Sequence, residues 1–103
     1  MIIEKFGVYL DDKSRPVVVV QTDLLNGIHP STIVCPITSR VVPELDTLRV
    51  HVMGKESGLT QASDILVDQI RTIDNRRFHR CLGRLSEASR KKLSENLHVL
   101  ILE

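Results

Sequence analysis

Apolar residues in this chain form short runs separated by turn residues, a pattern that predicts β-strands. Two runs are the most apolar, one of four consecutive valines at 17–20 and one at 32–37. The unbroken valines indicate a strand that is buried on both faces. Asn26-Gly27 and Pro30 lie between the two runs and predict a turn that separates the strands.

The rest of the chain predicts more strands of the same kind. Besides 16–22 and 32–37, the expected strands cover residues 2–10, 48–53, 64–74 with a bend, and 78–85 with an interruption at Gly83. Residues 40–46 contain Pro43 and are expected to be a loop, and residues 54–63 are expected to be a turn.

The final segment has helical periodicity instead. Ser86 suits the N-cap position and Glu87 suits the first turn of a helix. The apolar face of this helix, which we expect in the core or at a dimer contact, comprises Leu93, Leu97, Leu100 and Ile101. Five or six strands and one helix predict a mainly β (α+β) fold, an antiparallel, twisted and partly closed barrel with a C-terminal amphipathic helix.

Length and composition narrow the possible functions. With 103 residues, the chain is expected to form a single domain, residues 1–103. A net charge of +1 argues against a nucleic-acid binder that relies on a large basic excess. Aromatic residues make up only 3%, which argues against base-stacking platforms. Any contact with nucleic acid is therefore expected to use polar and charged side chains.

The two cysteines, Cys35 and Cys81, lack the spacing of a zinc or redox site. We expect both to be reduced core residues, and we expect neither a metal nor a cofactor. The N-terminus lacks the features of a signal peptide, and no apolar run is long enough to cross a bilayer. A cytoplasmic protein without membrane contact is the expectation.

Arg15 and Thr38 are the polar residues at the outer ends of the two main apolar runs. If the loop brings these strands side by side, the start of one and the end of the other lie on the same side. A guanidinium beside a hydroxyl is well suited to binding phosphate. The competing interpretation is a solvated arginine at a strand start and a hydroxyl that caps a turn.

Three patterns occur in order along the chain: RPVVVVQTD at 15–23, STIVCPITS at 31–39 and SDILVDQIRTID at 63–74. Together with the terminal helix, they resemble the MazF/PemK family of toxin endoribonucleases. The resemblance covers the chain from about Arg15 to the C-terminus. It implies an SH3-like barrel with the PemK/CcdB-like toxin fold.

The resemblance also implies an activity. Such a toxin is a homodimer that cleaves single-stranded RNA at short sequences without a metal, acting as an mRNA interferase, and a small MazE-like antitoxin neutralises it. By the family motif, Arg15 and Thr38 match the two catalytic positions. The residues expected to bind RNA are Asn26, Ser39, Arg40, Ser63 and Gln69.

Metal-free RNA cleavage normally uses the neighbouring 2′-hydroxyl as the nucleophile. Arg15 suits stabilisation of the charge that develops on the phosphate, and Thr38 can donate a second hydrogen bond. The general base is left open among a strongly perturbed Arg15, a nearby carboxylate and water. A mechanism with two histidines is the rival, but nothing in the sequence places two of the four histidines together.

The chain differs from the family just before Arg15. Many members have an acidic residue in the first strand and a long Gly-rich loop after it, whereas Phe6-Gly7-Val8-Tyr9 lacks the acidic residue and only residues 11–14 precede Arg15. Cleavage sequence, affinity and regulation are therefore left open. Five arginines between 71 and 84 are interpreted as a solvated strand edge rather than a phosphate-tracking surface, because acidic residues flank them.

Two other functions remain as alternatives. A toxin of the same barrel type can poison DNA gyrase through a Trp-containing tail, but this chain has no Trp. The second alternative is a catalytically weak module that binds an antitoxin, which the short turn before Arg15 would suit.

Overall fold

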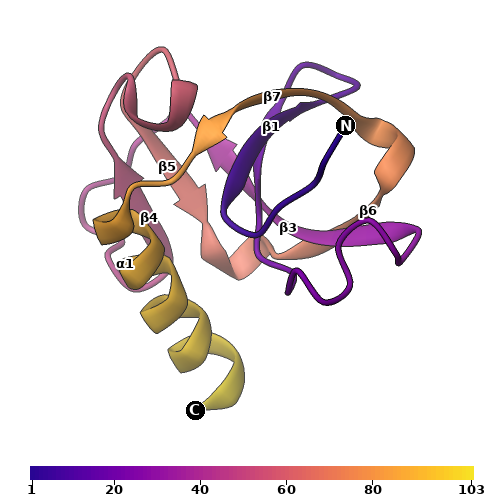
Figure 1. Cartoon of the computed structure of the whole chain (residues 1–103). Helices are drawn as coiled ribbons and strands as arrows, with labels where there is room; N and C mark the ends of the chain where they lie inside the picture. Colours follow the sequence, from indigo (N-terminus) through magenta and orange to yellow (C-terminus); the bar gives the residue numbers. More distant parts are fainter.

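The computed structural model describes the whole chain, residues 1–103, as a seven-stranded sheet and a C-terminal helix (Figure 1). The strands are β1 (Gly7–Asp11), β2 (Pro16–Val19), β3 (Ser31–Thr38), β4 (Arg49–Val52), β5 (Ser63–Leu66), β6 (Arg71–Asp74) and β7 (Phe78–Arg84). Helix α1 (Glu87–Leu97) continues into a π-helical turn, η4 (His98–Leu102). Three 3-10 turns complete the structure: η1 (Glu56–Gly58), η2 (Val67–Gln69) and η3 (Asn75–Arg77).

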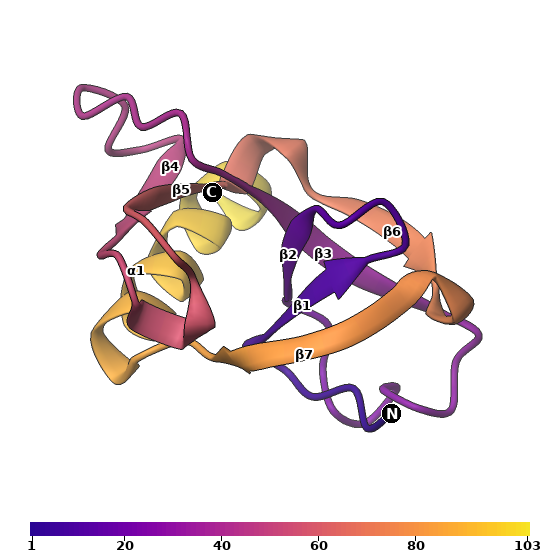
Figure 2. The same ribbon diagram turned by 90° about the horizontal axis from the view of Figure 1, so that it is seen from above.

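Strand β3 is the centre of the sheet. The strand order is β4-β5-β3-β2-β1-β7, with β6 also paired to β3, and every pair is antiparallel. The N-terminal half of β3 pairs with β6, and Ile37 and Thr38 at its other end pair with β5. Figure 2 shows how the strands curve around the interior, with β7 and β4 as unpaired edges. The predicted partly closed antiparallel barrel is therefore confirmed.

Several of the predicted strands have different bounds from those expected. The strand expected at 16–22 ends at Val19. The first strand begins at Gly7 rather than residue 2, because Phe6 adopts a φ of 65°, which an extended strand does not allow. The expected strand at 64–74 is divided by η2 into β5 and β6, which raises the number of strands to seven. Strand β7 continues through Gly83, which pairs with Val8 of β1, and the irregularity expected there takes the form of a register shift between Gly83 and Cys81.

The apolar residues form two clusters, one on each side of the curved sheet. The larger cluster includes Val18, Ile65 and Leu93, so it joins the strands to α1. The smaller cluster contains Tyr9 and Phe78, whose rings meet edge to face with centroids 5.3 Å apart. Val17, Val18 and Val19 are all fully buried, which confirms that this strand is covered on both faces.

Helix α1 begins as predicted, with the Ser86 hydroxyl accepting the backbone N–H of Ser89. Glu56 of η1 supports this end, because its Oε1 accepts the hydroxyls of both Ser86 and Ser89 at 2.6 Å. At the other end the helix extends away from the strands in Figure 1. Leu93 is fully buried, but Leu100 and Ile101 are 38% and 57% exposed. The apolar face therefore covers the core only along its first part.

Both cysteines are free thiols. Cys35 is buried, and this burial raises the pKa of its thiol to about 12. The prediction of a core position is wrong for Cys81, which is exposed because β7 is an edge strand whose outer face nothing covers. None of the helices is long and apolar enough to cross a membrane.

Candidate active site

Arg15 and Thr38 lie across from each other at the same end of the β2–β3 pair. The ladder joins Val17 to Pro36 and Val18 to Cys35, so the same register continued by two residues sets Arg15 opposite Thr38. Pro16 begins β2 and carries no N–H, so the ladder ends where Arg15 leaves it. The two residues that the sequence placed at strand ends are thus brought together by the sheet.

Both residues line the largest cavity of the molecule, which has a volume of about 600 Å³. Three arginines reach it, Arg15, Arg71 and Arg80, and no Asp or Glu is part of its lining. The other polar residues in the lining are Ser14, Thr38, Ser39, Thr60, Gln61, Ser63 and Gln69. In a chain with a net charge of only +1, this is a local concentration of positive charge that suits a polyanion.

Arg15 is held at the end of a tight turn that begins at Asp11. The backbone N–H groups of Lys13 and Arg15 both donate to Asp11 Oδ1 at 2.9 Å, and the backbone N–H of Asp11 donates to the Arg15 carbonyl at 2.9 Å. The Arg15 Nε lies 3.5 Å from Asp11 Oδ2, yet the Arg15 side chain is 52% exposed. The guanidinium of Arg15 therefore remains accessible from the cavity, while the main chain of Arg15 is fixed by the turn.

The Asp11 carboxyl is completely buried. Burial acts to raise its pKa, but the N–H groups of Arg15 and Lys13 and the charges of Arg15 and Arg77 outweigh burial and lower the pKa below its ordinary value. Asp11 is thus an anion at neutral pH, located behind the cavity rather than in it.

Thr38 is half-buried at the end of β3, and its Oγ1 accepts the backbone N–H of Arg40 at 3.1 Å. This hydrogen bond occupies one acceptor site of the hydroxyl, so the O–H is free to donate. Thr38 also pairs with Asp64 of β5, which fixes its backbone.

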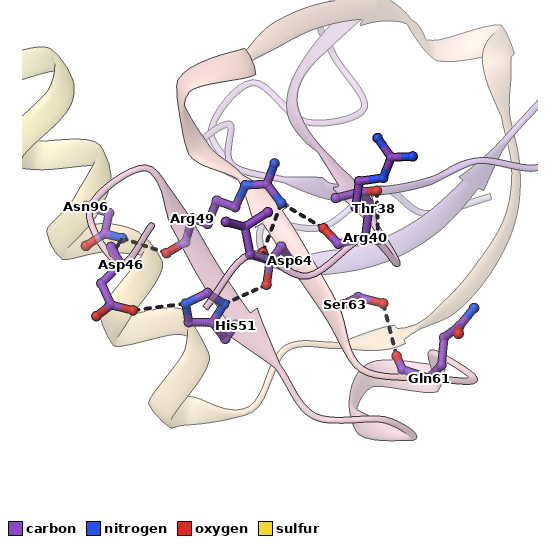
Figure 3. Close-up of polar contacts among 10 residues, drawn as sticks. Thr38, Arg40, Asp46, Arg49, His51, Gln61, Ser63, Asp64 and Asn96 are labelled. Atoms are coloured by element: carbon purple, nitrogen blue, oxygen red, sulfur yellow. Dashed lines mark hydrogen bonds and ion pairs between the residues drawn. The ribbon is translucent and has the colours of Figure 1, made fainter. Parts of the chain in front are cut away.

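Asp64 is the centre of a polar network that holds the segment after Thr38 (Figure 3). Its buried carboxylate accepts hydrogen bonds from the backbone N–H of Val42 at 2.9 Å and from Arg49 Nη1 at 3.0 Å. It also pairs with His51 Nδ1 at 2.6 Å. Arg49 Nη1 also donates to the Arg40 carbonyl at 2.8 Å, and His51 Nε2 lies 2.9 Å from Asp46. The loop between β3 and β4 is thereby attached to both β4 and β5.

The contacts within this network favour the charged forms of both Asp64 and His51. Burial acts to raise the pKa of Asp64, but the hydrogen bonds from Val42, His51 and Arg49 outweigh it and lower the pKa. The hydrogen bond to Asp64 raises the pKa of His51, assisted by Asp46 and opposed by burial.

Of the residues expected to bind RNA, Ser39, Ser63 and Gln69 line the cavity together with Arg15 and Thr38. Arg40 is exposed next to them but is not part of the lining. Asn26 also lies outside the cavity. Its side chain donates to the Gln21 carbonyl and to Asp23 and accepts from Gln21, which fits a turn residue.

The cavity includes residues that the sequence analysis did not select. Arg71 and Arg80 belong to the arginine cluster interpreted as a strand edge, yet they reach the cavity from β6 and β7. Ser14 and Gln61 lie in turns, where no sequence signal separates a lining residue from a solvated one. Arg71 could have been selected from the sequence, because it lies within the motif at 63–74 that carries the family resemblance.

Comparison with known proteins decides the family. The family model for the PemK-like, MazF-like toxin of type II toxin-antitoxin systems matches residues 9–101. The chain belongs to this toxin family. The match includes Arg15, Thr38 and every other cavity residue, so the site described above lies within the family domain.

Individual relatives agree with this assignment. The chain is 32% identical to Endoribonuclease EndoA of Bacillus subtilis, across 96% of this chain and 94% of EndoA. Among solved structures, Mycobacterium tuberculosis toxin MazF-mt6 superimposes with a TM-score of 0.80 at 27% identity, covering 90% of this chain and 93% of that one. A MazE–MazF structure from Deinococcus radiodurans gives a TM-score of 0.84 at 20% identity, covering 100% and 99%, which shows the shared fold.

Proposed function

We propose that this PemK/MazF-family protein is a sequence-selective, metal-independent endoribonuclease toxin that cleaves single-stranded RNA in the cavity holding Arg15 and Thr38. The observation that supports it best is the cavity itself: Arg15 opposite Thr38, with two further arginines and no carboxylate in the lining. The relative named Endoribonuclease EndoA, which matches nearly the whole chain, supports the reaction class.

The proposed reaction is a transphosphorylation. The 2′-hydroxyl of one nucleotide gives up its proton to a base as its oxygen forms a bond to the adjacent phosphorus. The bond from phosphorus to the 5′-oxygen breaks, the leaving 5′-oxygen takes up a proton, and a 2′,3′-cyclic phosphate remains. Negative charge gathers on the non-bridging phosphate oxygens as this happens. The Arg15 guanidinium supplies planar, permanently charged donors for those oxygens, and the free O–H of Thr38 supplies a second donor.

The remaining cavity residues are proposed to bind the chain of nucleotides on either side. Arg71 and Arg80 are exposed at the cavity and suit neighbouring phosphates. Ser39, Ser63 and Gln69 carry the donors and acceptors that reading unpaired base edges requires. The lining contains no aromatic side chain, so recognition is proposed to rest on hydrogen bonds and charge.

The surface also suits a homodimer. An apolar groove of about 370 Å³ lies between the sheet and the end of α1, lined by Lys5, Phe6, Val20, Ile33, Ile70, Ser94, Leu97, His98, Ile101 and Leu102. Val99, Leu100, Ile101 and Leu102 are exposed at that same end. We propose that a second copy covers this surface, because apolar groups gain stability on leaving water.

Control of the toxin is proposed to come from a MazE-like antitoxin. A type II toxin-antitoxin family pairs a toxin with a protein antitoxin, and solved structures of relatives include a MazE–MazF complex. Because the proposed substrate is single-stranded RNA such as mRNA, the cytoplasm is the proposed site of action.

Incubation of the purified protein with a long mixed-sequence single-stranded RNA in excess EDTA tests the function, with the new 5′ ends mapped by sequencing. We expect discrete cuts within a short common sequence. Arg15→Ala and Thr38→Ala should each remove them while the proteins remain folded. Intact RNA with the wild-type protein would overturn the proposed activity. Unchanged cutting by both variants would instead overturn the proposed site.

A further inference from the structure

The turn before Arg15 contains a buried anion, Asp11, which does not line the cavity. Asp11 is the last residue of β1, and its side chain has no exposed surface. Burying a carboxylate is costly unless charges and hydrogen bonds compensate for the lost water. The groups that offset the cost of burying the Asp11 carboxylate therefore indicate what this residue does.

The two oxygens of this carboxylate have different surroundings. Oδ1 accepts the backbone N–H groups of Lys13 and Arg15, and so it closes the turn. Oδ2 accepts no hydrogen bond and instead lies 3.5 Å from two guanidinium nitrogens, Arg15 Nε and Arg77 Nη2. One oxygen fixes the backbone at Arg15, and the other is aimed at its side chain.

The geometry points to Asp11 as the positioning residue for Arg15, holding its guanidinium toward the cavity from behind through Nε. This inference rests on the proposed function. A contact at Nε limits rotation of the long side chain, while the outer nitrogens Nη1 and Nη2 keep their four N–H donors for phosphate. Half of the Arg15 side chain is exposed, so without this contact it would sample many rotamers that face solvent.

Arg77 has a supporting position in this arrangement. Its Nε lies 3.1 Å from Asp12 and its Nη2 3.5 Å from Asp11, so it spans both acidic residues of the turn. The positive charge of Arg77 helps to keep Asp11 ionised, and it does so from outside the cavity lining. The short turn is thus held rigid by charge pairing, which places Arg15 before the substrate arrives.

Asp11→Asn separates the two functions of the carboxylate. The amide oxygen can still accept the N–H groups of Lys13 and Arg15, whereas the amide nitrogen in place of Oδ2 presents a donor to a donor. We expect kcat for RNA cleavage to fall by about 10- to 100-fold with KM nearly unchanged, because misplacing a group that acts in the transition state lowers kcat. The matched control is Asp68→Asn, the same change at an exposed residue that forms no ion pair and lies outside the cavity lining, which should stay within about twofold of the wild type.

A measurement without RNA tests the same contact independently. In the wild-type protein, the Nε–H NMR signal of Arg15 should exchange with water more slowly than that of Arg80, which is exposed and has no ion-pair partner. Asp11→Asn should remove this difference. Equal exchange of Arg15 and Arg80 in the wild type would overturn the inference even if the variant failed to fold.

The outcomes separate the inference from the proposed function. If the wild type cleaves RNA and Asp11→Asn is equally active, Asp11 is not a positioning residue, although the proposed function stands. If the wild type cleaves no RNA, the proposed function fails, and the exchange measurement still decides whether Asp11 anchors Arg15.

Discussion

Arg15 faces Thr38 across the β2–β3 ladder, two residues beyond its last recorded pair on that side, Val17 with Pro36. The two side chains thus come from adjacent strands, and each is held by its own local contact. The Arg15 main chain is fixed by Asp11, and the Thr38 hydroxyl accepts the N–H of Arg40. Their separation depends on the central sheet rather than on a mobile loop, which is the preorganisation that the proposed phosphate site requires.

Arg15→Lys should abolish most of the activity despite keeping the charge. Lysine has no planar fork of donors and no Nε to face Asp11, so it can neither bind two phosphate oxygens together nor be held in place. We expect kcat to fall by about 10²- to 10³-fold, close to the effect of Arg15→Ala. Single-turnover cleavage of a short RNA measures this. If lysine kept more than about a tenth of wild-type activity, charge alone would account for the role of Arg15.

Replacement of Thr38 distinguishes its hydroxyl from its shape. Thr38→Val keeps the branched side chain that suits a strand but removes the donor, and we expect kcat to fall by about 10²-fold. Thr38→Ser keeps the hydroxyl and should stay within about fivefold of the wild type. Both variants should unfold near the wild-type urea concentration. Equal activity of the Ser and Val variants would exclude a hydrogen-bonding role.

Arg71 and Arg80 should contribute to affinity rather than to the chemical step. Each single Ala substitution should raise KM, leave kcat nearly unchanged, and reduce the salt dependence of RNA binding by about 0.7 in the log–log slope. Arg76→Ala is the matched control, because Arg76 is exposed, pairs with Asp74 and lies outside the cavity. Fluorescence anisotropy with labelled RNA at several salt concentrations gives the slopes. An equal change in slope for Arg76→Ala would show that any surface arginine attracts RNA to the same degree, and that Arg71 and Arg80 have no special contact with it.

The sequence predicted the fold well where local signals agree with the final packing. The buried strand at Val17–Val19, the turn at Asn26-Gly27 and the Ser86 cap each depend on their immediate neighbours, and each is found where it was expected. The pairing of Arg15 with Thr38 was also predictable, because antiparallel neighbours bring the start of one strand to the end of the other. The bounds of the first strand were not, since the positive φ of Phe6 has no local sequence signal.

Residues that act through tertiary contacts escaped prediction. Asp11 looks like an ordinary turn residue, and only the fold shows that it is buried between Arg15 and Arg77. In the sequence, Asp64 similarly resembles an ordinary polar residue at the start of a strand. In the structure, its carboxylate forms hydrogen bonds with Val42, Arg49 and His51 from two other segments. Such networks join residues far apart in sequence, so neither periodicity nor spacing reveals them.

Gly58 should be intolerant of substitution because it has a positive φ of 81° and lies against β7. A Cβ there would come within 2.1 Å of the Leu82 carbonyl oxygen, and both residues line the cavity. We expect Gly58→Ala to lower the free energy of unfolding by about 2 kcal/mol or more and to reduce RNA cleavage. Urea unfolding and the cleavage assay measure the two effects.

Gly27→Ala provides the matched control for this effect. Gly27 has the same φ of 81°, but a Cβ there would meet nothing within 4 Å. This variant should lose only the cost of the left-handed backbone, about 1 kcal/mol, and keep its activity. If the two variants were equally stable, the close approach to Leu82 would not be what requires glycine at position 58.

The His51–Asp64 pair should make stability depend on pH in a defined direction. The raised pKa of His51 means that the folded protein binds its proton more tightly than the unfolded chain, whose value is near 6.5. This contribution is complete below pH 6.5 and is lost as the pH rises through the folded pKa. The lowered pKa of Asp64 acts in the opposite sense: its contribution is present above the ordinary value of 3.8 and is lost as the pH falls through the folded pKa.

We therefore expect the free energy of unfolding to decline as the pH rises above 6.5, and His51→Gln to remove most of this decline. Urea unfolding from pH 5 to 9 measures the decline, and an NMR titration of the imidazole follows His51 directly. His79→Gln is the control, because His79 is exposed and forms no ion pair, so the decline should persist. A titration of His51 below its ordinary value would contradict this account, since it would mean that Asp64 and Asp46 do not stabilise the charged imidazole.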